Sequence, residues 1–363
     1  MMRKLTAAVL LTLCLLPASG LAQEEDGVYT LLSPGGGTLT QYAGVPDAGD
    51  EYISGDNRHY RVTRVDQEAC TAQTEFLGEF SLPDVGWLDD DAQPVAAAKK
   101  AVALYCTHSD ESYVPTDGAS SIEKRGGIYD VAECLKKALE KQGVTVYYSD
   151  ENHFPHDAGA YRRSRSTAAS LAEEGVDAIF DVHRDGIPDA SQYESEINGQ
   201  EMTKVRLLVG RGNQNAEANK QFAAQIKAVA DKLYPGLVKD IYLGKGSYNQ
   251  DLMSQSVLLE FGTHVSDKEE AISSTDFMAN VLSRTLYGGV SGAAGSGKSG
   301  TKENTGGWTG TAWLVGFLIL GALLYAILST GNGRDALHKW KRTFQEMTGG
   351  FFGDHRGDND PEP

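Results

Sequence analysis

Cysteine and basic side chains are scarce in this sequence of 363 residues. It holds 33 lysines and arginines against 50 aspartates and glutamates, which gives a formal charge of −17 at pH 7. Because nucleic-acid phosphates are bound by basic surfaces, this balance argues against nucleic acid as a partner. No spacing among the 4 cysteines matches a CxxC metal knuckle, and a disulfide among Cys70, Cys106 and Cys134 stays open.

Long apolar runs are also lacking, except near the two ends of the chain. Residues 5–16 are largely apolar, follow the basic pair Arg3 and Lys4, and precede small residues that end at Ala22. This order is typical of a secretory signal, so we predict a signal peptide at 1–22. The alternative, an N-terminal membrane anchor, is disfavoured because the apolar run is short for a bilayer.

The second apolar run, residues 311–330, contains no charged residue and is long enough to cross a bilayer. Trp308 and Trp313 stand at its start, and several basic residues follow it. We therefore predict one transmembrane helix at 308–330 and a cytoplasmic tail at 331–363, with the preceding residues outside the membrane. The expected location is the cell membrane with a single span, and a buried core helix is the alternative.

A stretch rich in glycine, serine and threonine, residues 289–307, is typical of a flexible linker. It contains a literal phosphate-loop match, GAAGSGKS, at 292–299. That motif binds phosphate only between a buried strand and a helix. No strand pattern precedes it and glycines follow it, so we expect no nucleotide to bind here.

Strand and helix patterns alternate between residues 96 and 288. Apolar runs of strand length, separated by patterns of helical period, lie at 101–106, 144–148, 176–182, 204–209, 240–243 and 256–261. This alternation predicts an α/β domain at 96–288, with a partly parallel sheet and helices on both faces. Before it, residues 23–95 contain glycine-rich turns and short alternating runs, which predict a small β module of hairpins.

Polar residues stand at the ends of three of these apolar runs. His108 and His183 come just after two of them, and Glu260 ends a third. Because ligands bind beyond the carboxyl ends of strands in such sheets, we expect the three side chains to meet at one edge. Two histidines and a carboxylate suit Zn²⁺, and a further glutamate could accept the proton of an attacking water. No HExxH motif is present, and polar turns at strand ends are the alternative interpretation.

The residues around these positions resemble the stage II sporulation protein P family of endospore-forming bacteria. The resemblance covers roughly 50–288 and is carried by short runs: THSDESY at 107–113, AYRRSR at 160–165, IFDVHRDG at 179–186, RLLVGRGNQN at 206–215, YNQDL at 248–252 and LLEFGTH at 258–264. It implies an amidase-like fold and a zinc-dependent peptidoglycan hydrolase related to the N-acetylmuramoyl-L-alanine amidases. Such enzymes cleave the amide between N-acetylmuramic acid and the stem peptide, and the family is also associated with cleavage of peptide cross-links.

The resemblance also implies a ligand order of His, Glu and His, followed by a catalytic Glu. It assigns His108 and His183 as metal ligands and Glu260 as the catalytic residue. The glutamate ligand should stand shortly before the first helix, where Glu123 is predicted, with Glu111 as the rival and Asp110 as a third candidate.

Arg184 is predicted to lie beside the metal and to hold a substrate carboxylate or the developing oxyanion. Its alternative is an ion pair with Asp181 or Asp185, and either aspartate could orient a ligand histidine. His153 and His156 are expected in a loop near the site.

The resemblance makes a sporulation role in engulfment and a lytic transglycosylase partner, similar to stage II sporulation protein D, plausible. Members of the family are anchored at the N-terminus, whereas this chain is predicted to use its C-terminal helix, so a role in vegetative cells stays open. The alternative function is a wall-binding or scaffolding protein with a degenerate hydrolase site.

Overall fold

The computed structural model describes residues 27–89 and 100–288. The predicted signal peptide, linker, transmembrane helix and tail all lie outside these residues. Within the described residues, no helix is both long enough and apolar enough to span a bilayer.

In residues 27–89 and 100–288, eleven strands form one mixed sheet in the order β2-β1-β5-β4-β3-β12-β11-β13-β8-β6-β7, and β9 and β10 form a separate pair. The strands are β1 (Val28–Leu32), β2 (Thr38–Ala43), β3 (Glu51–Ile53), β4 (Arg58–Asp66), β5 (Thr71–Glu79), β6 (Ala101–Tyr105), β7 (Thr145–Tyr148), β8 (Ala178–Asp185), β9 (Glu194–Ile197), β10 (Gln200–Thr203), β11 (Val205–Gly210), β12 (Val238–Gly244) and β13 (Ser256–Thr263). The α-helices are α1 (Val114–Asp117), α2 (Ile128–Lys141), α3 (Ala160–Glu173), α4 (Ala216–Leu233) and α5 (Lys268–Tyr287).

The α/β part of the sheet is partly parallel, as predicted, and also contains one antiparallel pair. Strands β7, β6, β8 and β13 pair in parallel. Strand β11 runs antiparallel to β13, and β12 runs parallel to β11. Each of the six apolar runs predicted to be strands overlaps a strand. The carboxyl ends of these strands therefore determine where His108, His183 and Glu260 lie.

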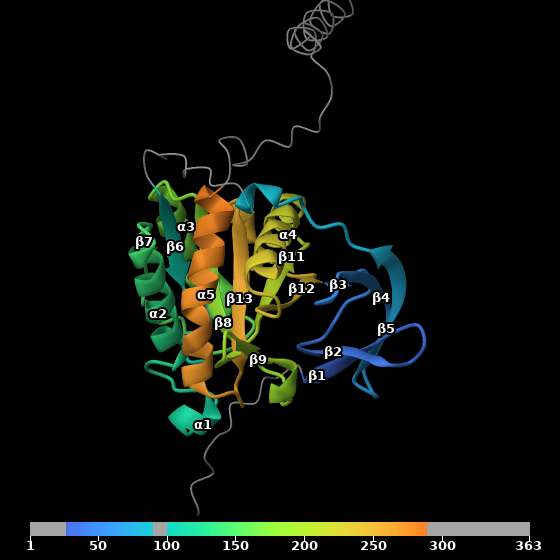
Figure 1. The fold of residues 1–363 in the computed structure, drawn as a ribbon. Helices are drawn as coiled ribbons and strands as arrows, with labels where there is room; N and C mark the ends of the chain where they lie inside the picture. The colour runs from blue at the N-terminus through green and yellow to red at the C-terminus, as the bar shows by residue number, and fades with distance from the viewer. Residues whose placement is uncertain (1–26, 90–99, 289–363) are drawn as a thin grey trace, which may run out of the picture. The chain divides into compact units, whose positions relative to one another are not determined.

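Helices cover both faces of this part of the sheet. Figure 1 shows α2, α5 and α4 side by side across one face, where α5 packs against both neighbours. In β6, Val102 and Leu104 join the core beneath these helices, whereas Ala103 and Tyr105 pack beneath α3 on the other face. This alternation follows from the opposite directions of successive side chains in a strand.

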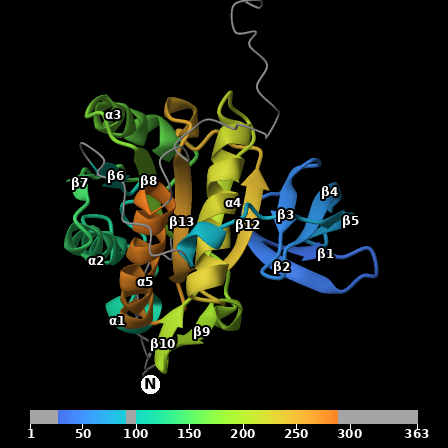
Figure 2. The same ribbon diagram turned by 45° about the horizontal axis from the view of Figure 1, so that its top comes forward.

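The five N-terminal strands extend the same sheet rather than forming a sheet of their own. Antiparallel pairing of β3 with β12 makes the connection, with Ile53 opposite Ile241. Figure 2 shows β1 to β5 gathered beside β12. The edge strand β2 turns back over the sheet, where the Tyr42 ring stacks on Tyr242 of β12 at 4.2 Å between centroids.

A buried arginine fastens β2 to the α/β strands. Arg206 of β11 donates hydrogen bonds to Thr40 Oγ1 (2.7 Å) and to the Gln41 carbonyl (3.0 Å) of β2. It also pairs with Asp240 Oδ1 (2.7 Å) of β12 and with Asp185 Oδ2 (2.8 Å) of β8. Because Arg206 is 1% exposed, its charge depends on these partners.

We expect Arg206→Met to lower the free energy of unfolding by about 3–5 kcal/mol, because buried carboxylates lose their counter-charge. Urea denaturation of the full-length protein measures the loss. Arg61→Met is the matched control, since Arg61 and its partner Glu75 are exposed, and it should cost less than about 1 kcal/mol. Equal effects of the two substitutions would contradict this role of Arg206.

Candidate metal centre and active site

The predicted histidines and the predicted catalytic glutamate meet at one edge of the sheet. His108 follows β6 in the loop that leads to α1, and His183 lies within β8, the strand next to β6. Glu260 of β13 stands directly beside His183 in the parallel register. The expectation that the strand ends bring these three residues together agrees with their positions in the structure.

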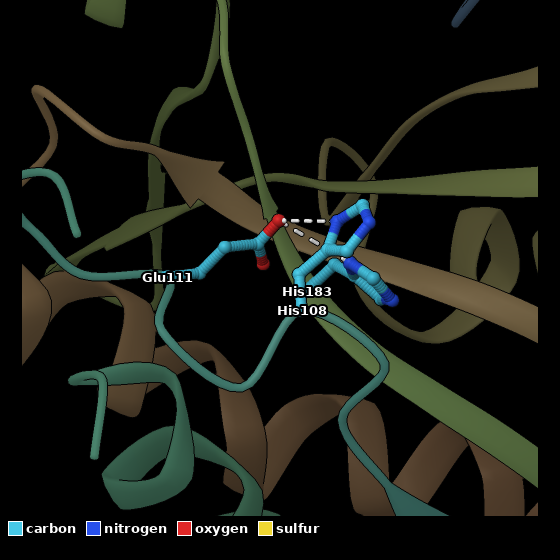
Figure 3. A group of neighbouring side chains, drawn as sticks. All are labelled: His108, Glu111 and His183. Carbon is cyan, nitrogen blue, oxygen red and sulfur yellow. Dashed lines mark hydrogen bonds and ion pairs between the residues drawn. The ribbon is translucent and has the colours of Figure 1, made fainter. Parts of the chain in front are cut away.

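Glu111 completes the group, and its carboxylate joins the two histidines. Its Oε1 lies 3.1 Å from Nδ1 of His108 and 3.3 Å from Nδ1 of His183 (Figure 3). Its Oε2 accepts a hydrogen bond of 3.0 Å from the backbone N–H of Arg184. One potential ligand atom from each of His108, Glu111 and His183 lies within 4.8 Å of the other two.

Glu123, the carboxylate predicted first, does not belong to this group. It is exposed, and its backbone carbonyl accepts a hydrogen bond from Asn152. The chain reverses between the two glutamates and forms a β-bridge from Glu111 to Ser121, which leaves Glu111 buried against the histidines. The structure therefore places Glu111, the rival candidate, rather than Glu123 beside the two histidines. Asp110, the third candidate, instead accepts a hydrogen bond from the Ser121 hydroxyl.

Arg184 is buried, and its side chain holds the reversed loop by hydrogen bonds to the backbone of the loop. Its guanidinium donates to the carbonyl oxygens of Ser112 (3.3 Å) and Ser120 (3.0 Å), at the two sides of the loop. A further contact of 3.4 Å reaches the carbonyl of Asp185. These contacts assign Arg184 a part in placing Glu111, and its predicted contact with substrate stays a prediction.

Asp181 supports His183 from the same strand. Its Oδ1 lies 2.9 Å from Nε2 of His183, close enough for an ion pair but out of line for a hydrogen bond. Thr107 holds the carboxylate in place, because its N–H and its hydroxyl donate to Oδ1 (2.8 Å) and Oδ2 (2.6 Å). Of the two aspartates predicted to orient a histidine, Asp181 has this position, whereas Asp185 pairs with Arg206.

The charges of the group are tightly coupled. Burial alone would lower the pKa of His183, but Asp181 and Glu111 outweigh it and raise that pKa well above its usual value. Burial would likewise raise the pKa of Glu111, yet His183 and Arg184 hold it well below the usual value. For Glu260, burial and then the charge of Asp185 raise the pKa well above the usual value. Glu260 is therefore the carboxyl of this site that most readily carries a proton.

A cavity of about 320 Å³ opens over the group. The sequence did not indicate that residues 42–45, at and after the end of β2, form one of its walls. The remaining lining includes His108, Glu111, His183, Arg184, Glu260, His156, Tyr161 and Tyr248. A cavity of this size fits a small ligand or the end of a larger one.

The donor set fits a divalent metal ion. Two imidazole nitrogens and one carboxylate oxygen are ligands that Zn²⁺ prefers, and three protein ligands leave a position for water or substrate. Nε2 of His183 has only its ion-pair contact with Asp181, and Oε2 of Glu260 is buried and has no hydrogen-bond partner among the described residues. Orphaned polar atoms of this kind are costly unless another group binds them.

The two histidines in the loop before α3 differ in their surroundings. His153 has both ring nitrogens occupied, by the Cys106 carbonyl at 2.8 Å and the Thr167 hydroxyl at 2.9 Å. His156 instead lines the cavity, and burial followed by the charge of His108 lowers its pKa to about 3. His153 is therefore a structural residue, whereas His156 faces the cavity over His108, Glu111 and His183, which are called the metal group below.

Comparison with protein families gives one match that covers more than half of the chain. The family model described as stage II sporulation protein P (SpoIIP) matches residues 52–283. A curated relative, the stage II sporulation protein P of Bacillus subtilis (strain 168), is 29% identical over 230 residues. That match covers 58% of this chain and 57% of the relative, so the chain spans little more than half of the relative's length.

Comparison with solved structures gives distant likenesses. The CwlD amidase of Clostridioides difficile, solved in complex with the GerS lipoprotein, matches with a TM-score of 0.37 and 11% identity, over 52% of this chain and 98% of that one. The N-acetylmuramyl-L-alanine amidase of Mycobacterium smegmatis matches with a TM-score of 0.34 and 19% identity, over 52% and 96% of the two chains.

We predict that Glu111→Ala lowers zinc affinity by more than about 100-fold, because a ligand and the link between the histidines are both lost. Glu123→Ala is the matched control and should retain zinc. Competition against a fluorescent zinc chelator measures both affinities. If Glu123→Ala loses zinc and Glu111→Ala keeps it, the assignment of the carboxylate is wrong.

Asp181→Asn should weaken zinc binding by about 10–100-fold, the range typical of groups that orient a ligand histidine. The amide keeps the size of the side chain but removes the charge beside His183. The same competition assay measures the change, and Asp177→Asn serves as control because Asp177 caps the start of β6 away from the site. Unchanged affinity in Asp181→Asn would exclude this supporting role.

Proposed function

The chain belongs to the stage II sporulation protein P family, and from this premise we propose that it is a zinc-dependent peptidoglycan hydrolase of sporulation. Its proposed reaction is cleavage of the amide between N-acetylmuramic acid and the stem peptide, with peptide cross-links as a second substrate. The observation that carries the proposal is the contact of Glu111 with both histidines, next to Glu260 in the cavity.

The proposed metal ligands are His108, Glu111 and His183, and the proposed metal is Zn²⁺. When bound, it would act as a Lewis acid toward the scissile carbonyl and the attacking water. Asp181 keeps the His183 ring in place, and Arg184 keeps Glu111 in place through the loop and its own N–H. The chain thus presents its proposed ligands on one strand, β8, and on the braced loop after β6.

Glu260 is the proposed general base and acid. It lines the cavity beside His183, and its Oε2 has no hydrogen-bond partner among the described residues. A carboxylate whose pKa is raised above its usual value is a stronger base, so it can accept a proton from water and return it to the leaving amine. The predicted assistance of Arg184 to a substrate carboxylate or oxyanion is retained as part of the proposal.

The proposed site of action lies outside the cytoplasmic membrane. A cleaved signal peptide at 1–22 and a membrane span at 308–330 would hold the domain there, with the tail at 331–363 in the cytoplasm. Peptidoglycan is the proposed substrate in that compartment, and a lytic transglycosylase that cuts the glycan is a proposed partner.

Two substitutions separate the proposed roles. Glu260→Gln should lower the rate of release of soluble fragments from purified cell walls by about 10²–10⁴-fold while zinc content stays unchanged, because only the proton acceptor is removed. His183→Ala should be inactive because it loses zinc. Dye release from labelled walls and metal analysis of the same samples measure both properties.

A wall-binding or scaffolding protein would give a different result. The unmodified protein would then sediment with walls and release no fragments, with or without added zinc. Near-normal turnover in Glu260→Gln, or full zinc content in His183→Ala, would contradict the proposed roles even if the protein is active.

A further inference from the structure

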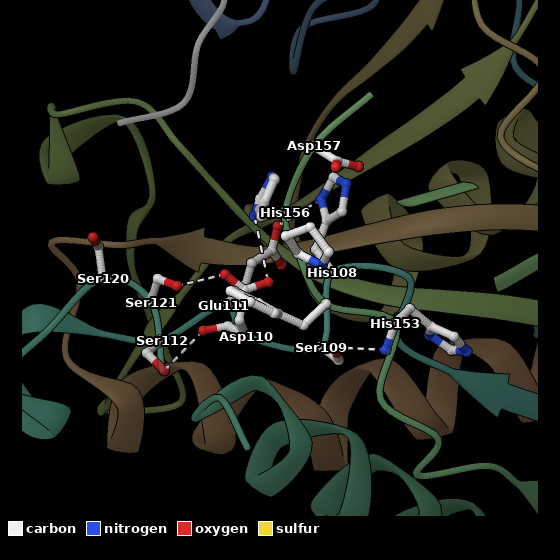
Figure 4. Close-up of polar contacts among 12 residues, drawn as sticks. His108, Ser109, Asp110, Glu111, Ser112, Ser120, Ser121, His153, His156 and Asp157 are labelled. Atoms are coloured by element: carbon white, nitrogen blue, oxygen red, sulfur yellow. Dashed lines mark hydrogen bonds and ion pairs between the residues drawn. The ribbon is translucent and has the colours of Figure 1, made fainter. Parts of the chain in front are cut away.

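His156 stands against the proposed metal group but is not part of it. Its ring stacks on that of His108 with 3.7 Å between centroids and 26° between planes. Figure 4 shows the two rings side by side, close to Asp110 and Glu111. His156 also lines the cavity. It is therefore placed where a substrate bound over His108 would meet it.

Asp110 gives the His156 ring a defined direction. This aspartate is 0% exposed, its Oδ2 accepts from the Ser121 hydroxyl, and its Oδ1 has no hydrogen-bond partner among the described residues. Nδ1 of His156 lies 3.7 Å from Oδ1. A buried carboxylate oxygen without a donor is costly, so the ring proton is favoured on Nδ1, facing Asp110.

With its proton on Nδ1, the neutral ring carries a lone pair on Nε2. No group among the described residues donates a hydrogen bond to that nitrogen. His153, in the same loop, has both of its nitrogens bonded to protein groups. His156 is therefore an unused hydrogen-bond acceptor on the cavity wall.

The carboxylates that line the cavity are engaged by other groups or have another proposed role. Asp185 accepts from Arg206 and from Tyr193 at 2.7 Å, and Asp157 pairs with Arg163. Glu111 is bonded to both histidines, and Glu260 is required for proton transfer in the proposed reaction. An amide bond that enters this cavity carries an N–H whose burial without an acceptor is unfavourable.

We propose that Nε2 of His156, oriented by Asp110, accepts a hydrogen bond from the N–H of the scissile amide and so selects amide over ester substrates. This inference rests on the proposed function and adds a substrate contact to it. Asp110 acts as a positioning residue, whereas His156 touches the substrate. No covalent step is involved, since the bond only aligns the amide beside the metal group and Glu260.

Binding without turnover tests the proposal. The full-length Glu260→Gln protein, loaded with zinc, is titrated by calorimetry with N-acetylmuramoyl-L-alanyl-D-isoglutamine and with the matched ester, in which oxygen replaces the N–H of the first linkage. The parent should bind the amide at least about fivefold more tightly than the ester, as expected for one buried hydrogen bond.

His156→Phe, added to Glu260→Gln, keeps an aromatic ring against His108 but removes the acceptor. We expect it to lower amide affinity to the level of the ester and to leave ester affinity within about twofold. His59→Phe is the control, because His59 pairs with Glu51 outside the cavity, and it should keep the preference. Asp110→Asn retains the His156 ring and should reduce the preference partway, which keeps the test valid if His156→Phe is unstable.

Three results would overturn the proposal. The first is an unchanged ratio of amide to ester affinity in both His156→Phe and Asp110→Asn. The second is a loss of zinc in His156→Phe, which would make His156 a metal-holding group. The third is that the parent binds neither compound. Failure of the proposed function is seen separately, as absence of fragment release from walls by the unmodified protein.

Discussion

The contact of one buried carboxylate with two histidines is the interaction on which the site depends. Glu111 is 2% exposed, so its charge is stable only with partners of opposite sign and with hydrogen-bond donors. His108, His183 and the backbone N–H of Arg184 supply them from the loop after β6 and from β8. The same carboxylate therefore closes the loop onto the sheet and joins the three side chains that are proposed to hold a metal ion.

A second set of buried charges connects this group to the N-terminal strands. Asp185, two residues after His183, pairs with Arg206, and Arg206 in turn bonds to β2. Since the chain just past β2 forms a wall of the cavity, the position of that wall depends on the same network that surrounds the metal group. The five N-terminal strands thus contribute to the proposed active site as well as to the sheet.

The sequence predicted the features that depend on local pattern. Apolar runs located the α/β strands, and the ends of those strands located His108, His183 and Glu260, because parallel strands present their carboxyl ends at one edge. The choice of Glu123 over Glu111 followed from position before the first helix. In the structure the intervening chain reverses through a β-bridge at Glu111, which leaves Glu111 rather than Glu123 beside the histidines, and no local pattern indicates this reversal.

Contacts between segments that are distant in the chain could not be predicted from such local patterns. The wall at residues 42–45 depends on β2 turning back to stack Tyr42 on Tyr242, which are 200 residues apart in the chain. The stacking of His156 on His108 likewise requires a loop between β7 and α3 to return to the end of β6. These positions are set by tertiary packing of aromatic and charged side chains rather than by hydrophobic period.

The central claim is that Glu111, and not another carboxylate, shares a metal ion with His108 and His183. Diffraction from crystals of the zinc-loaded full-length protein, recorded above and below the zinc absorption edge, tests it most directly. The account predicts one anomalous peak bounded by the Glu111 carboxylate and the rings of His108 and His183. A peak at Glu123, or a zinc-loaded protein without a peak at this group, would contradict it.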